Sequence, residues 1–465
     1  MNIADALSGR AGLAGVQWAL LDPQPREVLL RELGVLLEDP ALLERCTLHR
    51  AKFKPGRKLT AYYDLYLRGT QGEPPHARPI AVTWEPSGVG DRPAAPEALE
   101  MQDEARRRGL TAPFRQLAAV VPEWGMRIHV APLDVRFPQL VRLSDPAHVR
   151  DLVAAAYAAS AGGEALPPDA RYAVTSIRYR PGQRHVLRYD ALEPAGQSDS
   201  RTTFAKLYEG DNGARAFRVA TSVAGWLAAG GKGMSAVRPL AYLAADRVIL
   251  YPLVAGAPLS EQLRGPGQEV APFLQTIGSA LQALHHAPVE LAGDLKTNDF
   301  TSEIKAIARA AEHVPALLPA AGQQIDAIIE RARALHERMP QERPTFAHGD
   351  LKADHIWVTP AGLTLIDFDT CYMADPAIDV GKFLADLQWW CAAYDQPGVE
   401  QAQDRFLGGY ASSGARPERL TRARLYEALV LVKMTVRRVR LFDPDWAPRT
   451  RRLIARAGAL LDQLE

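Results

Sequence analysis

The stretch that decides the fold is HGDLKADHIWVTPAGLTLIDFD, which runs from residue 348 to residue 369. Asp350 precedes an apolar run that predicts a strand, and Asp367 follows a second such run. Because the strands of a hairpin run antiparallel, we expect both acids at one edge. Either acid alone is equally typical of a loop or a strand end. Together they suit phosphoryl transfer, in which one carboxylate orients the attacking hydroxyl and another holds the metal.

The whole segment 348–384, which continues through DTCYMADPAIDVGKFL, is similar to the catalytic loop and metal-binding motif of aminoglycoside phosphotransferases and choline kinases. This resemblance implies an α+β, bilobal, protein-kinase-like fold. A small antiparallel-sheet N-lobe would cover the nucleotide. A mainly helical C-lobe would carry catalysis and the acceptor. The close match is confined to this segment, so the rest of the chain has to be interpreted from its own residues.

The family's roles are carried over position by position. The resemblance implies that Asp350 is the catalytic base, that Asp367 is the principal magnesium ligand, and that Asp379 supports the catalytic loop. Asp369 matches a position that is commonly acidic, and we count it among the metal candidates. His348, which opens the motif, is expected to shape the catalytic loop together with the glycine that follows it.

The sequence departs from the family at His355, where the family usually has an asparagine as a second metal ligand. Neutral imidazole is a poorer partner for Mg²⁺, which is a hard ion that prefers oxygen. We still count His355 among the metal candidates, and several interpretations stay open. His355 binds the metal itself, it supports the loop while Asp367 and water hold the metal, the metal site is weakened, or His355 is an ordinary hydrogen-bonded loop histidine.

Composition predicts a globular protein with no strong overall field. The 465 residues are enough for about three domains. Lys plus Arg total 55 and Asp plus Glu total 54, which gives a formal net charge of +1 and no indication of a nucleic-acid or membrane partner. Three cysteines without a C-x-x-C pair argue against a disulfide framework. We find no signal peptide and no apolar run long enough to span a bilayer, and we expect a cytoplasmic protein.

Small-residue stretches at 158–170 and 230–234 suggest boundaries. We expect an accessory domain at 1–162, a nucleotide-binding N-lobe at 163–255 and a helical C-lobe at 256–465. Hydrophobic patterns predict the first elements of this plan. Helices are expected at 26–46, 145–161, 213–228, 271–286 and 427–442, and strands at 59–67 and 79–85.

An internal repeat relates the first two parts. Residues 53–65, FKPGRKLTAYYDL, match residues 179–191, YRPGQRHVLRYDA; residues 80–85, IAVTWE, match 204–209, FAKLYE; and residues 127–133, RIHVAPL, match 247–253, RVILYPL. Two generic hairpins would explain the first match alone. Three matches in the same order favour a duplication, so we interpret residues 1–162 as a degenerate copy of the N-lobe.

The nucleotide phosphates need a cationic contact, and Lys206 is our candidate. Strand alternation places it on one face with Phe204 and Tyr208. An edge-strand lysine with a packed stem would look similar. The matching residue of the first copy is Val82, so that copy should not bind ATP. It may pack on the active lobe, bind a partner or shape the substrate entrance, and the sequence does not choose among these.

Other nucleotide contacts are weaker expectations. The turn beside Gly182 offers Arg180, Gln183 and Arg184 to the phosphates, although a solvated turn explains them equally well. The resemblance implies an adenine-binding hinge at Tyr251, Leu253 and Val254. The helix expected at 213–228 lacks the glutamate with which the family pairs its lysine; Glu209 or Asp211 would have to substitute.

The acceptor is the least determined part of the site. Trp389, Trp390 and Tyr394 follow the motif and could stack on a sugar or ring, although such residues are more often core. Residues 401–465 contain 13 Lys or Arg and 7 Asp or Glu, which disfavours a polycationic aminoglycoside. A solvated helix face explains the same excess.

These observations favour an enzyme that moves the γ-phosphate of ATP, or of GTP, onto a hydroxyl of a sugar, metabolite or natural product with the help of Mg²⁺. A pseudokinase, meaning a nucleotide-sensing or scaffold module, is the main alternative, and AMP transfer on the same fold is another. The sequence leaves the oligomeric state open.

Overall fold

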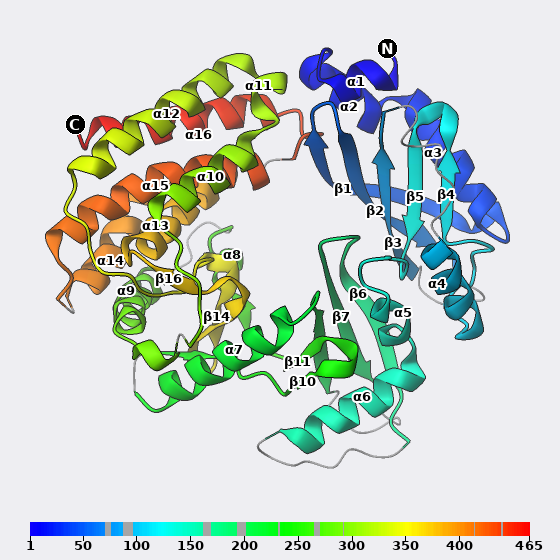
Figure 1. Ribbon diagram of the computed structural model, residues 1–465, viewed down its shortest axis with the longest axis horizontal. Helices are drawn as coiled ribbons and strands as arrows, with labels where there is room; N and C mark the ends of the chain where they lie inside the picture. The colour runs from blue at the N-terminus through cyan, green and yellow to red at the C-terminus, as the bar shows by residue number, and fades with distance from the viewer. Residues whose placement is uncertain are drawn as a thin grey trace. The chain divides into compact units, whose positions relative to one another are not determined.

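The computed structural model describes residues 1–69, 76–86, 96–160, 169–192, 201–230, 233–264, 270–291, 293–412, 414–438 and 440–465. The chain forms two compact units, whose elements are labelled in Figure 1. Unit 1 comprises Met1–Phe217, Pro239–Leu253 and Arg440–Asp443, and unit 2 comprises Arg218–Arg238, Val254–Val439 and Pro444–Glu465. Most of the expected accessory domain and N-lobe therefore belongs to one compact unit. No helix among the described residues is long and apolar enough to cross a membrane.

Unit 1 contains two five-stranded antiparallel sheets with the same topology (Figure 1). The first has the order β1 (Leu43–Lys54), β2 (Lys58–Leu67), β3 (His76–Trp84), β5 (Met126–Val130) and β4 (Ala118–Val121). The second has the order β6 (Tyr172–Arg180), β7 (Arg184–Ala191), β8 (Thr202–Leu207), β11 (Val248–Pro252) and β10 (Ala241–Leu243). A duplication predicts this shared order, in which the last strand along the chain lies inside the sheet.

The surrounding helices follow the same repeat. The first sheet is preceded by α1 (Ile3–Ser8), α2 (Gly12–Leu21), α3 (Pro23–Leu36) and the short η1 (Pro40–Leu42), and α4 (Pro96–Arg107) follows β3. The second sheet is preceded by α5 (Gln139–Leu143) and α6 (Pro146–Ala159), and α7 (Asn212–Ala228) follows β8. A short helix joins the last two strands of each sheet, η2 (Pro122–Trp124) or η3 (Ala244–Asp246). Each short helix ends in a left-handed residue, Gly125 at φ 53° or Arg247 at φ 48°.

The strand register corrects one detail of the repeat. Lys206 pairs with Val186 on β7 and with Ile249 on β11. We counted from the turns that the two sheets share to find the positions of β2 and β5 that match Val186 and Ile249. Both positions pair with Thr83, so Thr83 and not Val82 matches Lys206. The sequence alignment was wrong by one residue at β3 and by two residues at β5, because it matched side-chain types, whereas the hydrogen-bonded neighbours fix the register. The first sheet still has no lysine at this position.

A continuous core lies on one face of the second sheet. Buried residues of β7, β8 and β11, including Leu187, Tyr189 and Leu207, belong to one cluster with residues of α5 and α6. The cluster also includes Tyr62 and Ala81 of the first sheet. Residues of the second sheet therefore share their core with the accessory segment. This is what we expect if residues 1–162 pack on the nucleotide-binding lobe.

Hydrogen bonds reinforce this core. The hydroxyl of Tyr179 donates to the Leu133 carbonyl at 2.5 Å, and the hydroxyl of Tyr189 donates to the Leu143 carbonyl at 2.9 Å. Both tyrosines are buried, so their hydroxyls would lack partners without the segment that follows β5. Their partners are backbone groups, which side-chain patterns do not reveal.

Unit 2 is mainly helical. Its helices are α8 (Leu259–Gln262), α9 (Ala271–His285), α10 (Phe300–Ala311), α11 (Val314–Leu317), α12 (Pro319–Arg338), α13 (Ala377–Ala393), α14 (Val399–Ala411), α15 (Pro417–Arg438) and α16 (Trp446–Asp462), together with the short η4 (Val289–Leu291), η5 (Ala353–His355) and η6 (Phe368–Thr370). One small sheet has the order β12 (Ala257–Pro258), β14 (Ile356–Thr359), β15 (Gly362–Leu365) and β9 (Met234–Ala236), and β13 (Thr345–Ala347) pairs with β16 (Tyr372–Ala374). α13 approaches α15 closely, because a Cβ at Gly381 would lie 2.5 Å from the Ala423 carbonyl oxygen.

Most elements lie where the sequence patterns predict them, and the α+β class is confirmed. The helix expected at 26–46 is wrong in its second half: α3 ends at Leu36 and β1 begins at Leu43. Asp39 and Pro40 explain the early end, because the Asp39 side chain accepts the Ala41 N–H and starts a separate short helix. The apolar residues that extended the helical pattern belong to the strand.

Candidate active site

The loop between β13 and β14 carries the HGD motif in a conformation that requires glycine. Gly349 has φ 74°, and a Cβ there would lie 2.3 Å from the Thr370 carbonyl oxygen. Any larger residue would therefore push the loop away from its neighbour. The fully buried His348 accepts the Asp350 N–H at its Nδ1, 3.2 Å away, while its Nε2 lies 3.1 Å from the Ile366 carbonyl oxygen. His348 thus shapes the loop through hydrogen bonds.

Asp379 supports this loop from the first turn of α13. Its fully buried carboxylate accepts the N–H of His348 at 2.6 Å and the N–H of Gly349 at 2.9 Å. His285 Nε2 lies 3.5 Å away. Burial alone would raise the pKa of Asp379, but the contacts from His285 and the loop outweigh burial and lower it. The carboxylate is therefore charged and fixes the backbone that leads into Asp350, as the resemblance implies.

Two lysines hold the carboxylate of Asp350. Lys352 Nζ lies 2.7 Å from one carboxylate oxygen, and Lys382 Nζ lies 2.7 Å from the other. Lys382 also donates to the Gly349 carbonyl at 2.7 Å. Burial alone would raise the pKa of Asp350, but the two ammonium groups hold it well below its usual range. Asp350 is therefore an anion at neutral pH and a weak base, which suits orienting a hydroxyl better than removing its proton early.

Both lysines were missing from the sequence interpretation. Lys352 lies two positions after Asp350, where its proximity could have indicated a contact. Lys382 comes from α13, one helical turn after Asp379. Residues three apart on a helix share a face, so the assignment of Asp379 to loop support was itself a signal for Lys382.

Asp350, His355 and Asp367 form a cluster that could hold a metal ion, because one ligand atom from each lies within 4.8 Å of the others. Asp367 lies two residues after the end of β15 and has φ 68°, a left-handed conformation that is unusual outside glycine and is frequent at functional sites. Asp369 lies in the next short helix and is not a member of this cluster. The structure thus brings together two of the three expected metal residues and adds the proposed base.

His355 fits the metal site in a specific way. Its Nδ1 lies 3.0 Å from the Asp350 carbonyl oxygen, which only accepts, so this nitrogen carries the proton. Its Nε2 lies 3.3 Å from Asp367 Oδ2. Burial lowers the pKa of His355 to about 3, so the ring is neutral at pH 7. Two electron-rich atoms then face each other, an arrangement that a bound cation would stabilise. Loop support and metal binding are therefore compatible roles.

In unit 1, Lys206 lies in β8 on the face opposite the α5 and α6 core. Its Nζ is 6.0 Å from the centre of the Tyr208 ring. α7 provides no acid in its first turn, as the sequence showed. Glu209 contacts Arg136, whose Nη2 lies 2.6 and 2.7 Å from its carboxylate oxygens. The substitute acid considered for Lys206 therefore belongs to another ion pair.

The turn between β6 and β7 differs from the expectation of a phosphate loop. The amide of Gln183 donates to the Tyr62 hydroxyl at 3.0 Å and accepts from Lys52, so the accessory segment holds this side chain. Burial, together with the nearby Arg50 and Arg178 guanidinium groups, lowers the pKa of Arg180 to about 9. Such a concentration of half-buried positive charge favours an anion at Arg180. Arg184 lies half-buried at the start of β7.

The expected adenine hinge lies at the boundary of the two units, which falls between Leu253 and Val254. Tyr251 pairs with Phe204 in the second sheet. The Leu253 N–H donates to the Thr202 carbonyl at 3.2 Å, while its side chain is 52% exposed. An exposed leucine at this point is available for an apolar contact.

The aromatic residues proposed for the acceptor are covered by arginines. Trp390 is buried and stacks on Tyr394 with 5.6 Å between ring centres, and the Arg264 guanidinium lies 5.1 Å from the Trp390 ring centre. Arg438 lies 4.8 Å from the ring centre of Trp389. This packing favours a core role for Trp390.

Many basic residues of the C-terminal segment are in ion pairs. Arg419 and Arg422 contact Glu342, and Arg438 Nη1 lies 2.6 Å from the buried Asp386. The local excess of positive charge is therefore partly a structural network within unit 2. It is weaker evidence about the acceptor than the sequence suggested, and the interpretation as a solvated face is incomplete.

Residues 195–426 match the model of the phosphotransferase enzyme family. This part of the chain belongs to that family. The match includes the HGD loop, the three-residue cluster and Lys206, so the resemblance on which the sequence analysis rested is confirmed. The prediction of a phosphotransferase is confirmed at the level of the family.

Several solved structures resemble this phosphotransferase chain at low identity. A choline kinase from Cryptosporidium parvum has 12% identity and a TM-score of 0.47, with 68% of this chain and 97% of that chain covered. A choline/ethanolamine kinase family protein from Mesorhizobium loti has 16% identity and a TM-score of 0.39, covering 57% and 86%. A spectinomycin phosphotransferase has 13% identity and a TM-score of 0.43, covering 62% and 92%. A search of curated proteins gives no match.

Proposed function

We propose that this chain transfers the γ-phosphate of ATP to a hydroxyl group of a small molecule, with Asp350 as the residue that orients the hydroxyl. The cluster of Asp350, His355 and Asp367 carries the proposal. It combines a carboxylate that can accept the hydrogen bond of a hydroxyl with residues that can hold a metal ion, and it lies in the part of the chain that matches a phosphotransferase family. The acceptor class is a sugar, metabolite or natural product with a free hydroxyl.

The metal would be held by Asp367 and His355, and when bound it would neutralise charge on the transferred phosphate. The remaining steps belong to the chain. Asp350 accepts the hydrogen bond of the attacking hydroxyl, fixes its direction and takes its proton as the new oxygen–phosphorus bond forms and the bond from the γ-phosphorus to ADP breaks. Phosphoryl transfer passes through a loose transition state, so the hydroxyl does not need a strong base before it reacts. The pKa of Asp350, held low by its lysines, agrees with this order of events.

Lys352 supplies a positive charge beside the reacting hydroxyl, because its ammonium group contacts Asp350 directly. A cation at this point would attract a phosphate oxygen during transfer. Lys382 contacts both Asp350 and the Gly349 carbonyl, so we assign it to positioning of the catalytic carboxylate.

For the nucleotide, we propose Lys206 and Arg180 as phosphate contacts and the segment from Tyr251 to Val254 as the adenine contact. The half-buried positive charge around Arg180 and the exposed side chain of Leu253 support these assignments. Gln183 is a weaker candidate for a phosphate contact than the sequence indicated, because its amide group already forms hydrogen bonds with Tyr62 and Lys52. GTP is the alternative donor, and Asp369 is kept as an acid beside the metal site.

The test compares transfer from γ-labelled and α-labelled ATP to a panel of small alcohols, with Mg²⁺ or Mn²⁺ present. We expect the γ label to reach an acceptor, and Asp350→Asn to reduce the rate by about a hundredfold or more. Asp354→Asn, an acid in the same loop but outside the cluster, is the matched control and should retain the rate. Transfer of the α label would indicate AMP transfer. Intact nucleotide binding without any transfer that depends on Asp350 would favour the scaffold alternative.

A further inference from the structure

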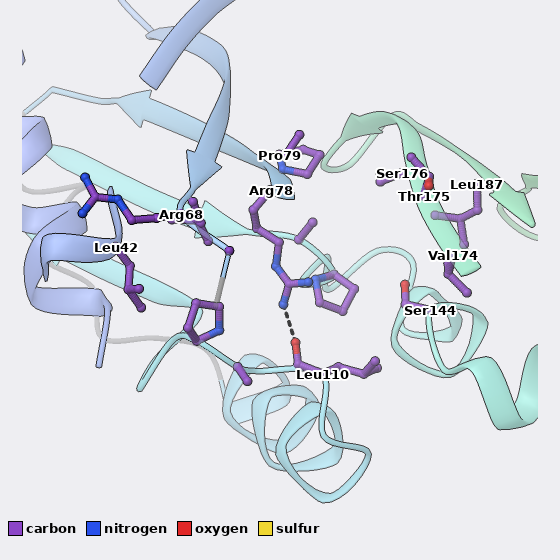
Figure 2. A pocket seen from close by; sticks show the side chains of 17 residues that line it. Leu42, Arg68, Arg78, Pro79, Leu110, Ser144, Val174, Thr175, Ser176 and Leu187 are labelled. Atoms are coloured by element: carbon purple, nitrogen blue, oxygen red, sulfur yellow. Dashed lines mark hydrogen bonds between the residues drawn. The ribbon is translucent and has the colours of Figure 1, made fainter. Parts of the chain in front are cut away.

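Unit 1 contains a cavity of about 560 Å³ at which the accessory segment meets the second sheet (Figure 2). Its walls come from β3, the segment after α4, and β6. None of the residues proposed for nucleotide, metal or acceptor lines it. The volume lies in the usual range for small-molecule sites. The walls are largely apolar, with contributions that include Leu42, Leu67, Leu110, Val174 and Leu187.

Arg78 is the charged group of this cavity. Its guanidinium points toward Leu110 and donates to the carbonyl of that residue, as the dashed line in Figure 2 shows. Its Nε is buried and has no hydrogen-bond partner. Within the described part of the chain, no carboxylate forms an ion pair with Arg78; its other close contact is the Phe114 ring, with 5.8 Å from the guanidinium carbon to the ring centre. Burial lowers the pKa of Arg78 to about 10.

An arginine in this position is unusual. A cation whose donor atoms are removed from water and which has no anionic partner is destabilising unless something compensates it. A guanidinium also has donors in a planar fork that matches a carboxylate. Arg78 has donor groups left over beside an open volume, so the cavity supplies space for the partner that the protein itself does not provide.

The rest of the lining limits the class of partner. Figure 2 shows that Arg68, the other arginine of the lining, directs its guanidinium away from Arg78. One cation facing the cavity suits a single negative charge, whereas a phosphate dianion usually needs two or more cations. The hydroxyls of Ser144 and Ser176 lie across the cavity from Arg78 and can bond a further polar group of a ligand. The apolar walls suit an apolar body.

We propose that this cavity binds a small organic monocarboxylate, with its carboxylate on Arg78 and its apolar body against the walls from β6. The site is separate from the proposed phosphotransfer chemistry and does not depend on it. It would give residues 1–162 a binding function in addition to packing.

The experiment uses benzoate and octanoate as probes and benzamide and octanamide as their neutral counterparts, with binding measured by calorimetry and saturation-transfer NMR on the full chain. We expect at least one carboxylate to bind, and its amide to bind at least about tenfold more weakly, because the charge-assisted bonds to Arg78 are lost. Equal binding of acid and amide would overturn the proposal, as would an absence of binding by both acids. Inorganic phosphate that displaces the acid at lower concentration would overturn the monocarboxylate class.

Three variants locate the probe. Arg78→Gln keeps a donor for the Leu110 carbonyl and should weaken acid binding by about tenfold or more. Arg68→Gln is the matched control and should change binding less than about twofold. Val174→Trp fills the cavity without altering Arg78 and should abolish binding. Each variant is first checked for an unchanged circular dichroism spectrum and an unchanged thermal midpoint. Unaltered acid binding in folded Arg78→Gln would refute the site.

Discussion

At the scale of single residues, our proposal makes His355 the residue that sets the ion preference of the metal site. Its Nε2 faces the Asp367 carboxylate, and a nitrogen ligand favours Mn²⁺ over Mg²⁺ when compared with the oxygen of the family's asparagine. In the proposed metal site, the departure from the family's asparagine would therefore change the ligand chemistry and not only weaken the site. The ring is already oriented by the Asp350 carbonyl, as metal-binding imidazoles usually are.

We predict that His355→Asn shifts the preference toward Mg²⁺ by about tenfold relative to the original chain. Titration of Mn²⁺ followed by electron paramagnetic resonance, with Mg²⁺ as competitor, measures this ratio without any need for turnover. His355→Ala is the control and should weaken both ions. A ratio that stays constant in His355→Asn would show that the imidazole does not contact the metal.

Lys382 offers a second test at this scale, because it is one of the two cations that keep Asp350 ionised. Lys382→Met should raise the pKa of Asp350. Burial raises this pKa, and without Lys382 the main charge that still lowers it is that of Lys352. Asp350 must be ionised to accept the hydroxyl, so activity is lost as pH falls through this pKa. We therefore expect the acidic limb of the kcat profile to move to higher pH, with kcat at neutral pH reduced by about tenfold or more. A lower kcat with an unshifted limb would contradict this role.

At the scale of elements, α13 and α15 are joined by Arg422. This arginine is 2% exposed, and it donates to Asp375 at 2.7 Å and to Glu342 at 2.6 Å. Asp375 also accepts the Ala377 N–H at the start of α13. The ion pairs thus connect α15 with the helix that positions Asp379 under the catalytic loop.

Arg422→Met should lower the free energy of unfolding by about 3 kcal/mol, because it leaves two partly buried carboxylates with less compensation. Denaturant titration measures this change. Arg416→Met, at an exposed position just before α15, is the matched control, and a change within about 0.5 kcal/mol is expected. Similar midpoints for the two variants would mean that Arg422 contributes little to stability.

The elements also show what could be predicted from the sequence. Local patterns gave the hairpins, the long helices and the HGD loop, because alternation and turn residues act within a few positions. The helix expected at 26–46 ends early, because a capping aspartate and a proline outweigh the apolar periodicity of the second half. The residue of the first copy that matches Lys206 was predicted one position away from its place in the sheet, because hydrogen bonds to the neighbouring strands set the register. Lys382 was missed because its contact with Asp350 depends on how α13 packs, although its position three residues after Asp379 indicates the same helix face.

At the scale of the whole molecule, Asp134 links the accessory segment to the turn proposed for nucleotide contact. Its Oδ2 accepts the Gly182 N–H at 2.7 Å and lies 2.7 Å from His185 Nε2. Both contacts belong to unit 1, in which the two sheets form one compact body. The turn between β6 and β7 is thereby fixed before any nucleotide binds.

Asp134→Ala should therefore loosen both sheets, with a loss of about 2 kcal/mol or more because a buried N–H and a buried ring nitrogen lose their acceptor. Hydrogen exchange measured by mass spectrometry would show faster exchange in peptides from β1–β5 as well as from β6–β8. Asp151→Ala, on the exposed side of α6, is the control. Faster exchange confined to one sheet would contradict a shared cooperative unit.

The hydroxyls of Tyr179 and Tyr189, which find their acceptors in the segment after β5, bear on how this chain can change over generations. A descendant that lost its first 160 or so residues would carry two buried tyrosine hydroxyls without acceptors and an uncovered apolar face in the sheet proposed to bind the nucleotide. Such a deletion would be removed by selection even if the lost segment bound nothing. The neighbouring sheet thus depends on the accessory segment, so the segment is retained whether or not it binds anything. Its surface residues can therefore change and come to bind a ligand.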